Sequence, residues 1–501
     1  MDEQNAVTEV TQEQPIVAKA DAGTRSYDVD FPEKFKEFMR TGWRDSTLDV
    51  SLRLEVPHHA KRRIQLSAAF PGETLVIPSG REKVRANDTL YRFRPGSDFM
   101  WLTGEHDPDA VLIMRPNGGG HDATLFIRPR SPRDTDEFFR NAMYGELWIG
   151  RRHTLSEKAA ELGIETENLD KLGEALGSCP PARTRVLRGY DPVVDAAVLP
   201  YDNAEAGTRD RELATKLSEL RLVKDEWEIA QLQDAIDATV RGFEDVARIL
   251  PSDRAVPERL LEGVFGLRAR FDGNDLGYSS IVGAGANATI LHWIRNTGVT
   301  EPGRLLLMDM GVENHNLYTA DVTRTLPVSG RFSPAQRAIY EIVHRSQQAG
   351  MDAVAPGVTY EDVAMACNTV LAEGLRDLGL LPCSVEEALS KDSMVYRRWT
   401  LHGFGHMLGL DVHDCSNARK ELYRDGSLGE GYVLTVEPGL YFQPDDELVP
   451  EELRGIGVRI EDDVLVTATG AHNLSAGLPR TADDVEAWLD AQRAAGPRLP
   501  S

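Results

Sequence analysis

The sequence predicts an α+β protein of two domains, in which a mixed α/β domain precedes a domain of helices and mostly antiparallel strands. Three observations lead to this prediction. The chain has 501 residues, enough for two ordinary domains. Over residues 31–201, short strand-like runs alternate with helical ones. After residue 219, long amphipathic helices are interspersed with apolar strand-like runs.

Four ranges are predicted along the chain. Residues 1–34 are an acidic, polar tail that lacks the basic and apolar parts of a secretory signal, so we expect it to be disordered. The N-terminal domain covers 35–218, where "ETLVIPSG", "AVLIMRP" and "ATLFIRPR" are bounded by Pro and Gly, as strands often are. The second domain covers 219–475, and residues 476–501 form a C-terminal tail.

Three helices are predicted in the second domain. The first carries one apolar stripe, in steps of three and four residues, and Pro251 ends it. In the second, Ser333 is the N-cap, Pro334 takes the first helical position and Gln336 completes a capping box. The third begins at Thr359. The stripe of the first helix consists of Ile229, Leu232, Ile236, Val240, Phe243, Val246 and Ile249.

The strands of the second domain contain carboxylates where apolar residues are expected. Asp309 directly follows the apolar run in "RLLLMDMG", and Asp321 lies in the strand-like "YTADVTRTLPV". Glu437 and Glu461 lie inside "YVLTVEPGLYF" and "VRIEDDVLV". Burying an ionised carboxylate costs several kcal/mol unless it is paired or bound to a metal. An ion pair with Arg324 or Arg459 would explain one of them, but four together indicate two divalent cations.

The stretch "LHGFGHMLGLDVHD" supplies three histidines, His402, His406 and His413. One imidazole among four carboxylates suits Mn²⁺ or a similar metal better than a structural zinc site, which favours Cys and His. The spacing alone leaves open which histidine binds metal and which is a satisfied core residue.

Charge and cysteine usage limit the partners. The formal charge of −24 disfavours nucleic acid, and "HHAKRR" (residues 58–63) is interpreted as a solvated helix face. No apolar run is long enough for a membrane span. The four scattered cysteines indicate a reducing compartment, so we expect a cytoplasmic protein.

The ordered motifs "ILHW", "MDMG…ADVTRTLPVSG", "HGFGHMLGLDVHD", "LTVEPGLYF" and "GIGVRIEDDVLVT" resemble the pita-bread metallopeptidases, above all the aminopeptidase P family. "LYRFRPGSDFMWLTGEHDPDAVLIM" is similar to the N-terminal domain of that family and of prolidase. The resemblance covers residues 35–475. It implies a pita-bread catalytic domain preceded by a mixed α/β domain, and a dimer or tetramer as the assembly.

The resemblance also implies a site. A two-metal centre, usually of manganese, would be held by Asp309, Asp321, His406, Glu437 and Glu461, with Asp321 and Glu461 bridging. His292, Tyr278, Val412, Tyr441 and Arg459 would bind substrate, and His413, Glu437 and His402 would be catalytic. The expected substrates are peptides with proline in the second position. One departure is the eleven-residue spacer "MGVENHNLYTA" between the two aspartates, where ten is usual; the extra residue is expected in the turn around 314–316.

The chemistry expected of such a centre is hydrolysis. Two cations that share a water lower its pKa towards about 7, and the resulting hydroxide would attack the scissile carbonyl carbon. His413 would stabilise the oxyanion, and Glu437 would pass the proton to the leaving nitrogen. The enzyme would then release the first residue of the peptide.

Four alternatives stay open. Prolidase has the same fold and metals but cleaves only Xaa-Pro dipeptides. Creatinase-like chemistry is disfavoured because the ligand positions are intact, and a non-catalytic binding module is disfavoured for the same reason. "GAGANA" (residues 283–288) fits a dinucleotide-binding GxGxxA, but no helix is predicted after it.

Overall fold

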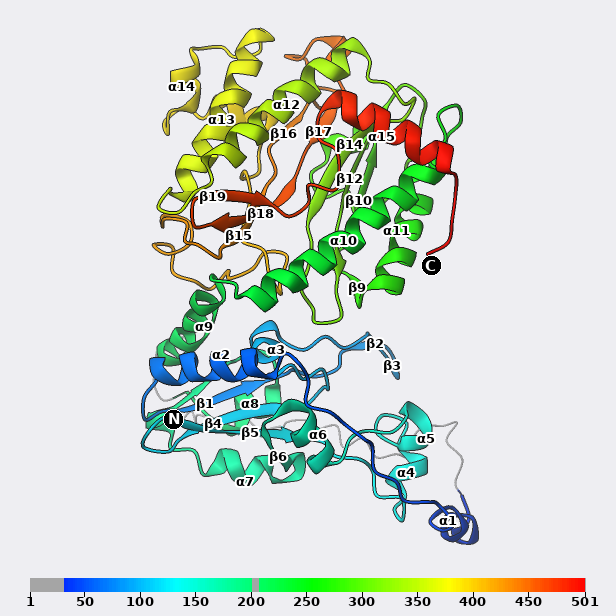
Figure 1. The fold of residues 1–501 in the computed structure, drawn as a ribbon, viewed down its shortest axis with the longest axis vertical. Coiled ribbons are helices and arrows are strands. Elements are labelled where there is room, and N and C mark those ends of the chain that lie inside the picture. The colour runs from blue at the N-terminus through cyan, green and yellow to red at the C-terminus, as the bar shows by residue number, and fades with distance from the viewer. Residues whose placement is uncertain (1–30, 201–206, 501) are drawn as a thin grey trace, which may run out of the picture. The chain divides into compact units, whose positions relative to one another are not determined.

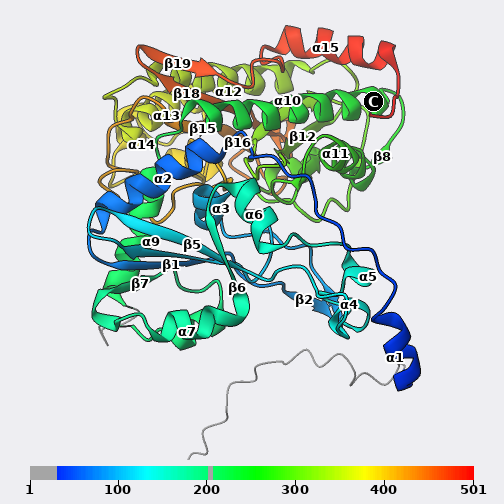
Figure 2. The same ribbon diagram turned by 60° about the horizontal axis from the view of Figure 1, so that its bottom comes forward.

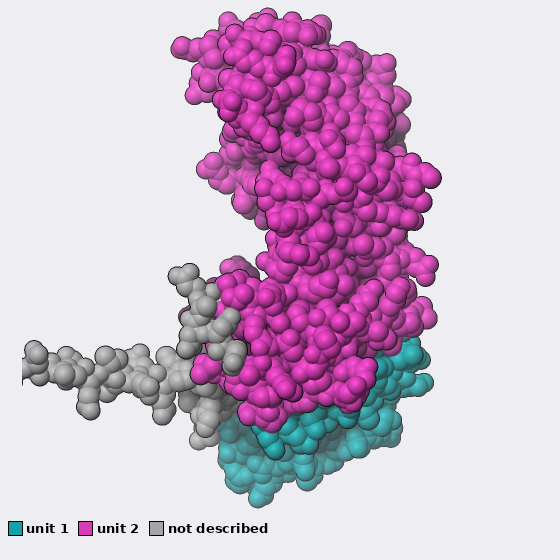
Figure 3. Space-filling model, turned by 90° about the vertical axis from the view of Figure 1, so that its left-hand side faces the viewer, with its two compact units in different colours: residues 1–53, 124–174 teal, residues 54–123, 175–501 magenta. Residues whose placement is uncertain are grey.

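The computed structural model describes residues 31–200 and 207–500, so most of the predicted tail, residues 1–30, lies outside them. The chain forms two compact units (Figure 3). Unit 1 consists of Met1–Arg53 and Thr124–Glu174, and unit 2 consists of Leu54–Ala123 and Ala175–Ser501. The predicted domain ranges 35–218 and 219–475 do not coincide with these two units, and they stay a prediction.

Unit 1 is built of short helices and one parallel strand pair. Strand β5 (His121–Ile127) enters the unit at residue 124 and pairs with β6 (Glu165–Asn168), with Thr124 opposite Glu165. Its helices are α1 (Glu33–Met39), α4 (Glu137–Arg140), α5 (Glu146–Ile149) and α6 (Leu155–Leu162), and α7 (Leu172–Gly177) leaves it.

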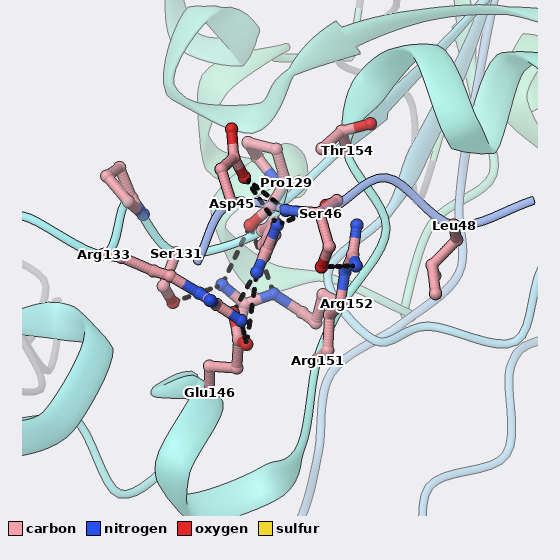
Figure 4. A network of polar contacts seen from close by, with 12 residues as sticks. Asp45, Ser46, Leu48, Pro129, Ser131, Arg133, Glu146, Arg151, Arg152 and Thr154 are labelled. Atoms are coloured by element: carbon pink, nitrogen blue, oxygen red, sulfur yellow. Dashed lines mark hydrogen bonds and ion pairs between the residues drawn. The ribbon is translucent and has the colours of Figure 1, made fainter. Parts of the chain in front are cut away.

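A polar network organises the start of α6 (Figure 4). Thr154 and Glu157 form a capping box, in which the Thr154 hydroxyl accepts from the Glu157 amide and the Glu157 carboxylate accepts from the Thr154 amide. The same carboxylate accepts from the Leu48 amide at 2.5 Å and from the Arg151 guanidinium at 2.7 Å. Glu157 therefore fastens the 40s segment to the first turn of α6.

We expect Glu157→Gln to destabilise unit 1 in a pH-dependent way. Burial opposes ionisation, but the Thr154 and Leu48 amides and Arg151 hold the pKa of Glu157 at about 2, below its ordinary 4.5. A depressed pKa means that the stabilisation is complete above pH 4.5 and is lost as pH falls towards 2. Losing charge-assisted hydrogen bonds of this kind costs about 2 kcal/mol at pH 7. Denaturant unfolding of both proteins at pH 7 and at pH 3 measures the difference.

The exposed Glu165 provides the control. Glu165→Gln should change the free energy of unfolding by less than about 0.5 kcal/mol at either pH. An E157Q penalty that is as large at pH 3 as at pH 7 would contradict the ionic account.

The first part of unit 2 packs helices against a small sheet. Strand β1 pairs antiparallel with β4 and parallel with β7. The predicted strands near residues 73–80 and 110–116 are thus confirmed as β1 and β4. The elements of this part are α2 (Val56–Ala69), β1 (Thr74–Pro78), β2 (Val84–Ala86), β3 (Thr89–Leu90), α3 (Ser97–Thr103), β4 (Val111–Pro116), β7 (Thr184–Val186), α8 (Pro192–Ala197) and α9 (Thr208–Arg221).

One expectation about this part is wrong. The "HHAKRR" helix face is not simply solvated, because His59, Arg62 and Arg63 on α2 are buried. Arg62 donates to Asp225 at 3.1 Å, and Arg63 donates to the Leu102 carbonyl at 2.6 Å. A cation with such partners can be buried, which a pattern of charges in the sequence does not reveal.

The second part of unit 2 holds the three predicted helices and the strands that follow them. All three N-caps carry a capping box, at Asp225, Ser333 and Thr359. Figure 1 shows α10 running with α11, and α12 with α13, around the strands. The helices are α10 (Glu226–Ile249), α11 (Glu258–Asp272), α12 (Pro334–Ala353), α13 (Tyr360–Asp377), α14 (Val385–Leu389) and α15 (Ala482–Ala495).

The strands of this part form antiparallel groups that position the carboxylates. Their orders are β10-β12-β14, β15-β18-β19 and β16-β17, with the short pairs β8-β11 and β9-β13. Figure 2 shows β19 beside β18, with which it pairs. Asp309 faces Ile281 on one neighbouring strand and Thr323 on the other. The bounds are β8 (Val256–Pro257), β9 (Asp275–Leu276), β10 (Ile281–Ala284), β11 (Val299–Thr300), β12 (Leu305–Met310), β13 (Val312–Glu313), β14 (Val322–Pro327), β15 (Val433–Val436), β16 (Gly439–Tyr441), β17 (Gly457–Arg459), β18 (Asp462–Thr467) and β19 (Gly470–Asn473).

Two strands predicted as continuous are broken at a carboxylate. Glu437 lies between β15 and β16, and Glu461 lies between β17 and β18. Pro438 follows Glu437 and has no N–H to continue a ladder. The breaks free both residues from regular pairing and turn their side chains to a common cavity.

Three smaller features bear on other predictions. The spacer between the aspartates forms a hairpin whose turn includes Asn314 and Leu317, with Leu317 at φ +67°. "GAGANA" enters a short 3₁₀ turn (Gly285–Thr289), which gives a pyrophosphate no helix to bind. Within the predicted C-terminal tail, α15 buries Val485 and Leu489.

Among the described helices, none is long and apolar enough to cross a membrane.

Candidate active site

The predicted site residues meet at one cavity of about 480 Å³ in unit 2. Apolar side chains, among them Ile281, Leu291 and Ile294, line it together with polar ones. Every predicted site residue except Tyr441 lines it. These are Tyr278, His292, Asp309, Asp321, His402, His406, Val412, His413, Glu437, Arg459 and Glu461.

Asp321, His406 and Glu461 form the centre of the site. They can each offer one atom to a common ion, because these atoms lie within 4.8 Å of one another. His406 Nε2 lies 3.3 Å from Asp321 Oδ2 and 3.6 Å from Glu437 Oε1. The backbone of His406 is fixed by Thr435, whose amide donates to its carbonyl at 2.8 Å and whose hydroxyl accepts from its amide at 3.1 Å.

Asp309 joins this centre through shared partners. The Tyr278 hydroxyl lies 2.6 Å from Asp309 Oδ1 and 2.5 Å from Asp321 Oδ1. The Arg459 guanidinium donates to Asp309 Oδ2. The Tyr278 side chain also lines the cavity, so its predicted role as a substrate contact stays a prediction.

The charges of the site do not balance. Four carboxylates face the guanidinium of Arg459 and the imidazole of His406, the cavity histidine whose pKa is raised. Burial raises the pKa of Asp309, although Arg459 opposes this. Burial, with Asp321 and Glu437, raises the pKa of Glu461 well above its usual range. Burial raises the pKa of Glu437 to about 7 against the opposing effect of His406. Asp309, Glu437 and Glu461 thus ionise unfavourably unless more positive charge is added.

Divalent cations fit this donor set. Carboxylate oxygens with one neutral imidazole are ligands for Mn²⁺ and related metals, and the site offers no thiolate. Burial opposes protonation of His406, but Asp321 and Glu437 raise its pKa to about 9. The imidazole must therefore lose a proton to bind a cation, and the cation would take over the charge compensation that the proton supplies.

Two residues that support the proposed ligands were not predicted from the sequence. The Thr323 hydroxyl donates to Glu461 Oε2 at 2.6 Å, and the Asp463 carboxylate accepts from the Asp321 amide at 3.1 Å. Both side chains are fully buried. The signal was present as polar residues at buried strand positions, in "DVTRT" and "EDD". Thr323 orients the Glu461 carboxylate and Asp463 holds the backbone of Asp321, the two residues that the resemblance makes bridging ligands.

The other histidines surround the centre. His402 Nε2 lies 2.7 Å from the Tyr441 hydroxyl, and its Nδ1 lies 3.4 Å from Glu437. Burial and Arg459 lower the pKa of His402 to about 3, which keeps this ring neutral. The rings of His413 and His406 meet edge to face, with centroids 4.4 Å apart. Tyr441 thus acts on the cavity through His402 and Arg459, which its hydroxyl contacts.

This geometry is suited to one class of protein, the metal-dependent hydrolases. A carboxylate-rich centre with one imidazole adjoins neutral histidines that can donate hydrogen bonds, and all of them open to a cavity large enough for a short peptide.

Comparisons with known proteins agree with this class. Residues 230–468 match the family model "Metallopeptidase family M24", and residues 59–186 match "Aminopeptidase P, N-terminal domain". The chain is 53% identical over 460 residues to Xaa-Pro aminopeptidase 1 of Streptomyces coelicolor, covering 92% of each chain. It is 33% identical over 454 residues to the Xaa-Pro aminopeptidase of Escherichia coli, covering 86% of this chain and 97% of that one.

Solved structures agree as well. The structure of Pseudomonas aeruginosa aminopeptidase PepP is similar with a TM-score of 0.77 at 31% identity, over 88% of this chain and 100% of that one. Aminopeptidase P from E. coli with the inhibitor Pro-Leu is similar with a TM-score of 0.75 at 30% identity, over 90% of this chain and 100% of that one.

The chain therefore belongs to the Xaa-Pro aminopeptidase (aminopeptidase P) family of M24 metallopeptidases. The predicted family and the predicted fold class, a pita-bread domain after an aminopeptidase P-type N-terminal domain, are confirmed. The assignment of individual residues as ligands, catalytic groups or substrate contacts stays a prediction.

Proposed function

We propose that this chain is a metal-dependent exopeptidase that releases the N-terminal residue from peptides with proline in the second position. The observation that carries the proposal is the convergence of Asp321, His406 and Glu461 at a peptide-sized cavity, in a chain 53% identical to an Xaa-Pro aminopeptidase. We further propose that the ions are two Mn²⁺, held by Asp309, Asp321, His406, Glu437 and Glu461.

Divalent cations held by these five residues would polarise the scissile carbonyl and make water a nucleophile at neutral pH. The remaining work belongs to side chains. Glu437, which lies at the cavity wall beside His406, accepts the proton of the attacking water and gives it to the prolyl nitrogen. His413 donates a hydrogen bond to the carbonyl oxygen as negative charge develops on it.

The other cavity residues bind the substrate in this proposal. Tyr278, Val412 and Tyr441 form the proline pocket, and His292 lines the substrate site. The Tyr278 hydroxyl also contacts Asp309 and Asp321. Arg459 and His402 share the Tyr441 hydroxyl, which fixes both side chains at the cavity wall. Because the prolyl nitrogen belongs to a tertiary amide with restricted φ, a shaped apolar pocket is required.

Metal removal and peptide length test this function together. Metal-stripped protein should be inactive, and Mn²⁺ should restore release of the first residue from an Xaa-Pro-Yaa tripeptide. Omitting the metal, or replacing proline by alanine in the peptide, should leave no turnover. Cleavage of an Xaa-Pro dipeptide alone would favour prolidase, and silence on both peptides with ions bound would overturn the proposed substrate.

The location and assembly are part of the proposal. All four cysteines are free, which supports a reducing, cytoplasmic environment. We propose a homo-oligomer, dimer or tetramer, which light scattering of the purified protein would test. Residues 35–218 and 219–475 are proposed as the two domains.

A further inference from the structure

The segment of residues 408–414, here called the histidine loop, contributes two residues to the cavity wall. Two carboxylates of the same loop lie outside that wall. Val412 and His413 line the cavity. Asp411 and Asp414 flank them in sequence and bind Arg221 instead. The loop has no helix or strand of its own over these residues, so its shape depends on these contacts.

Arg221 bridges the two ends of the Val412–His413 pair. It is the last residue of α9 and is only 4% exposed. Its Nη2 donates to Asp411 Oδ2 at 2.7 Å and also to Asp414 Oδ1, while its Nη1 donates to Asp98 Oδ1 at 2.8 Å. A planar guanidinium fixes the directions of all these bonds, which an ammonium would not do.

Lys224 and a close backbone contact hold the second end of the loop. The Lys224 Nζ donates to Asp414 Oδ2 at 2.9 Å. A Cβ atom on Gly409 would lie 2.3 Å from the same oxygen, so only glycine fits there. Burial opposes ionisation of Asp414, but Arg221 and Lys224 hold its pKa well below the usual range.

A second arginine holds the first end. Arg94 donates to the Leu410 carbonyl at 2.6 Å and to the Ser97 hydroxyl at 3.0 Å. Ser97 in turn donates to Asp411 Oδ1 at 2.6 Å. The Asp411 side chain is 43% exposed, so this end depends on directed bonds more than on packing.

Stability alone is a weak reason for such a cluster. Burying ions costs several kcal/mol each, and apolar residues of similar volume often stabilise a protein as well or better. What a network of directed, charge-assisted bonds provides is a fixed geometry. Here the geometry concerns the His413 ring, which is in contact with His406.

We propose that Arg221 is a positioning residue: by holding Asp411 and Asp414 it sets where His413 and Val412 stand in the cavity. The inference rests on the proposed function, since it assigns a role in the same reaction. Arg221 does not line the cavity, so it acts through the loop.

The test compares Arg221→Lys with the wild-type enzyme. Lysine keeps the positive charge but lacks the planar guanidinium group with its several directed N–H donors. We expect kcat on an Xaa-Pro-Yaa tripeptide to fall about tenfold while the bound Mn²⁺ per chain stays at the wild-type value, because misplacing a reacting group by an ångström or less costs this much. In a His413→Ala background, the same R221K change should lower kcat by less than about twofold, because Val412, which carries no catalytic group, is then the only positioned residue left.

Arg268 provides a matched control for the loss of a buried guanidinium group. It is 3% exposed on α11 and donates to Asp245 at 2.8 Å and to Asp272 at 3.2 Å, but it does not line the cavity. R268K should lower the midpoint of thermal unfolding and leave kcat within about twofold. If R221K behaves in the same way, or if its effect is undiminished in the His413→Ala background, the proposal is overturned.

A structural readout separates this inference from the proposed function. The crystal structure of R221K should show the His413 ring moved from its 4.4 Å contact with His406, and R268K should not. That comparison needs no activity, so it holds even if no Xaa-Pro peptide is cleaved. If R221K fails to fold, Asp411→Asn is tested in its place, because it removes one carboxylate charge from the exposed end of the loop. An unmoved His413 ring together with an unchanged kcat in that variant would refute the inference.

Discussion

Asp321→Asn is expected to abolish peptidase activity and to reduce the metal content of the purified protein. Asp321 offers one of the atoms that lie within 4.8 Å of one another at the centre, and its Oδ1 shares the Tyr278 hydroxyl with Asp309. An amide has the size of a carboxylate but supplies no charge to a cation. We expect kcat/KM on the tripeptide to fall by about 10³-fold or more, with Mn²⁺ per chain measured by plasma emission spectroscopy.

Asp462→Asn is the matched control for Asp321→Asn. Asp462 is fully buried in the adjoining strand β18, but it pairs with Arg324 at 2.7 Å and does not line the cavity. Its variant should lose stability and keep its metal. If D321N retained full turnover, or lost turnover with two ions per chain still bound, the assignment of Asp321 as a ligand would be wrong.

Three helices and most strands of the second domain could be predicted because their signals are local, whereas α11 and α14 were not predicted. The apolar stripe of α10 and the capping box at Ser333 depend on residues within one turn of each other, and both are present in the structure. The strand breaks at Glu437 and Glu461 could not be predicted, because each "apolar run" is two strands of different sheets. Which sheet a strand joins depends on partners far along the chain.

The carboxylates of the site could be predicted from the sequence, but the residues that hold them in place could not. Charged residues in apolar runs stand out in a sequence, so the four carboxylates were found without coordinates. The supporting groups do not stand out: Thr323 is an ordinary strand residue, and Arg221 is one of three arginines on a polar helix. Their importance comes from burial and from partners that are distant in sequence, as with the 190 and 193 positions that separate Arg221 from Asp411 and Asp414.

His413→Ala is expected to lower kcat by about 10²-fold while metal content stays at the wild-type value. The sequence pattern left open which histidine binds metal, and the structure gives the two rings different surroundings. His406 contacts Asp321 and Glu437 through Nε2, whereas the ring contact of His413 is with His406 itself. Removing a hydrogen-bond donor to a developing oxyanion typically costs about 10²-fold or more in kcat.

The comparison with His406→Ala makes the roles separable. His406→Ala should lose activity together with bound metal, because it removes the one imidazole among the proposed ligands. Measuring kcat and Mn²⁺ per chain for both variants gives two distinct patterns, one with metal kept and one with metal lost. Metal loss in His413→Ala, with metal retained in His406→Ala, would mean that the two histidines exchange roles, and the positioning role of Arg221 would then concern a metal ligand.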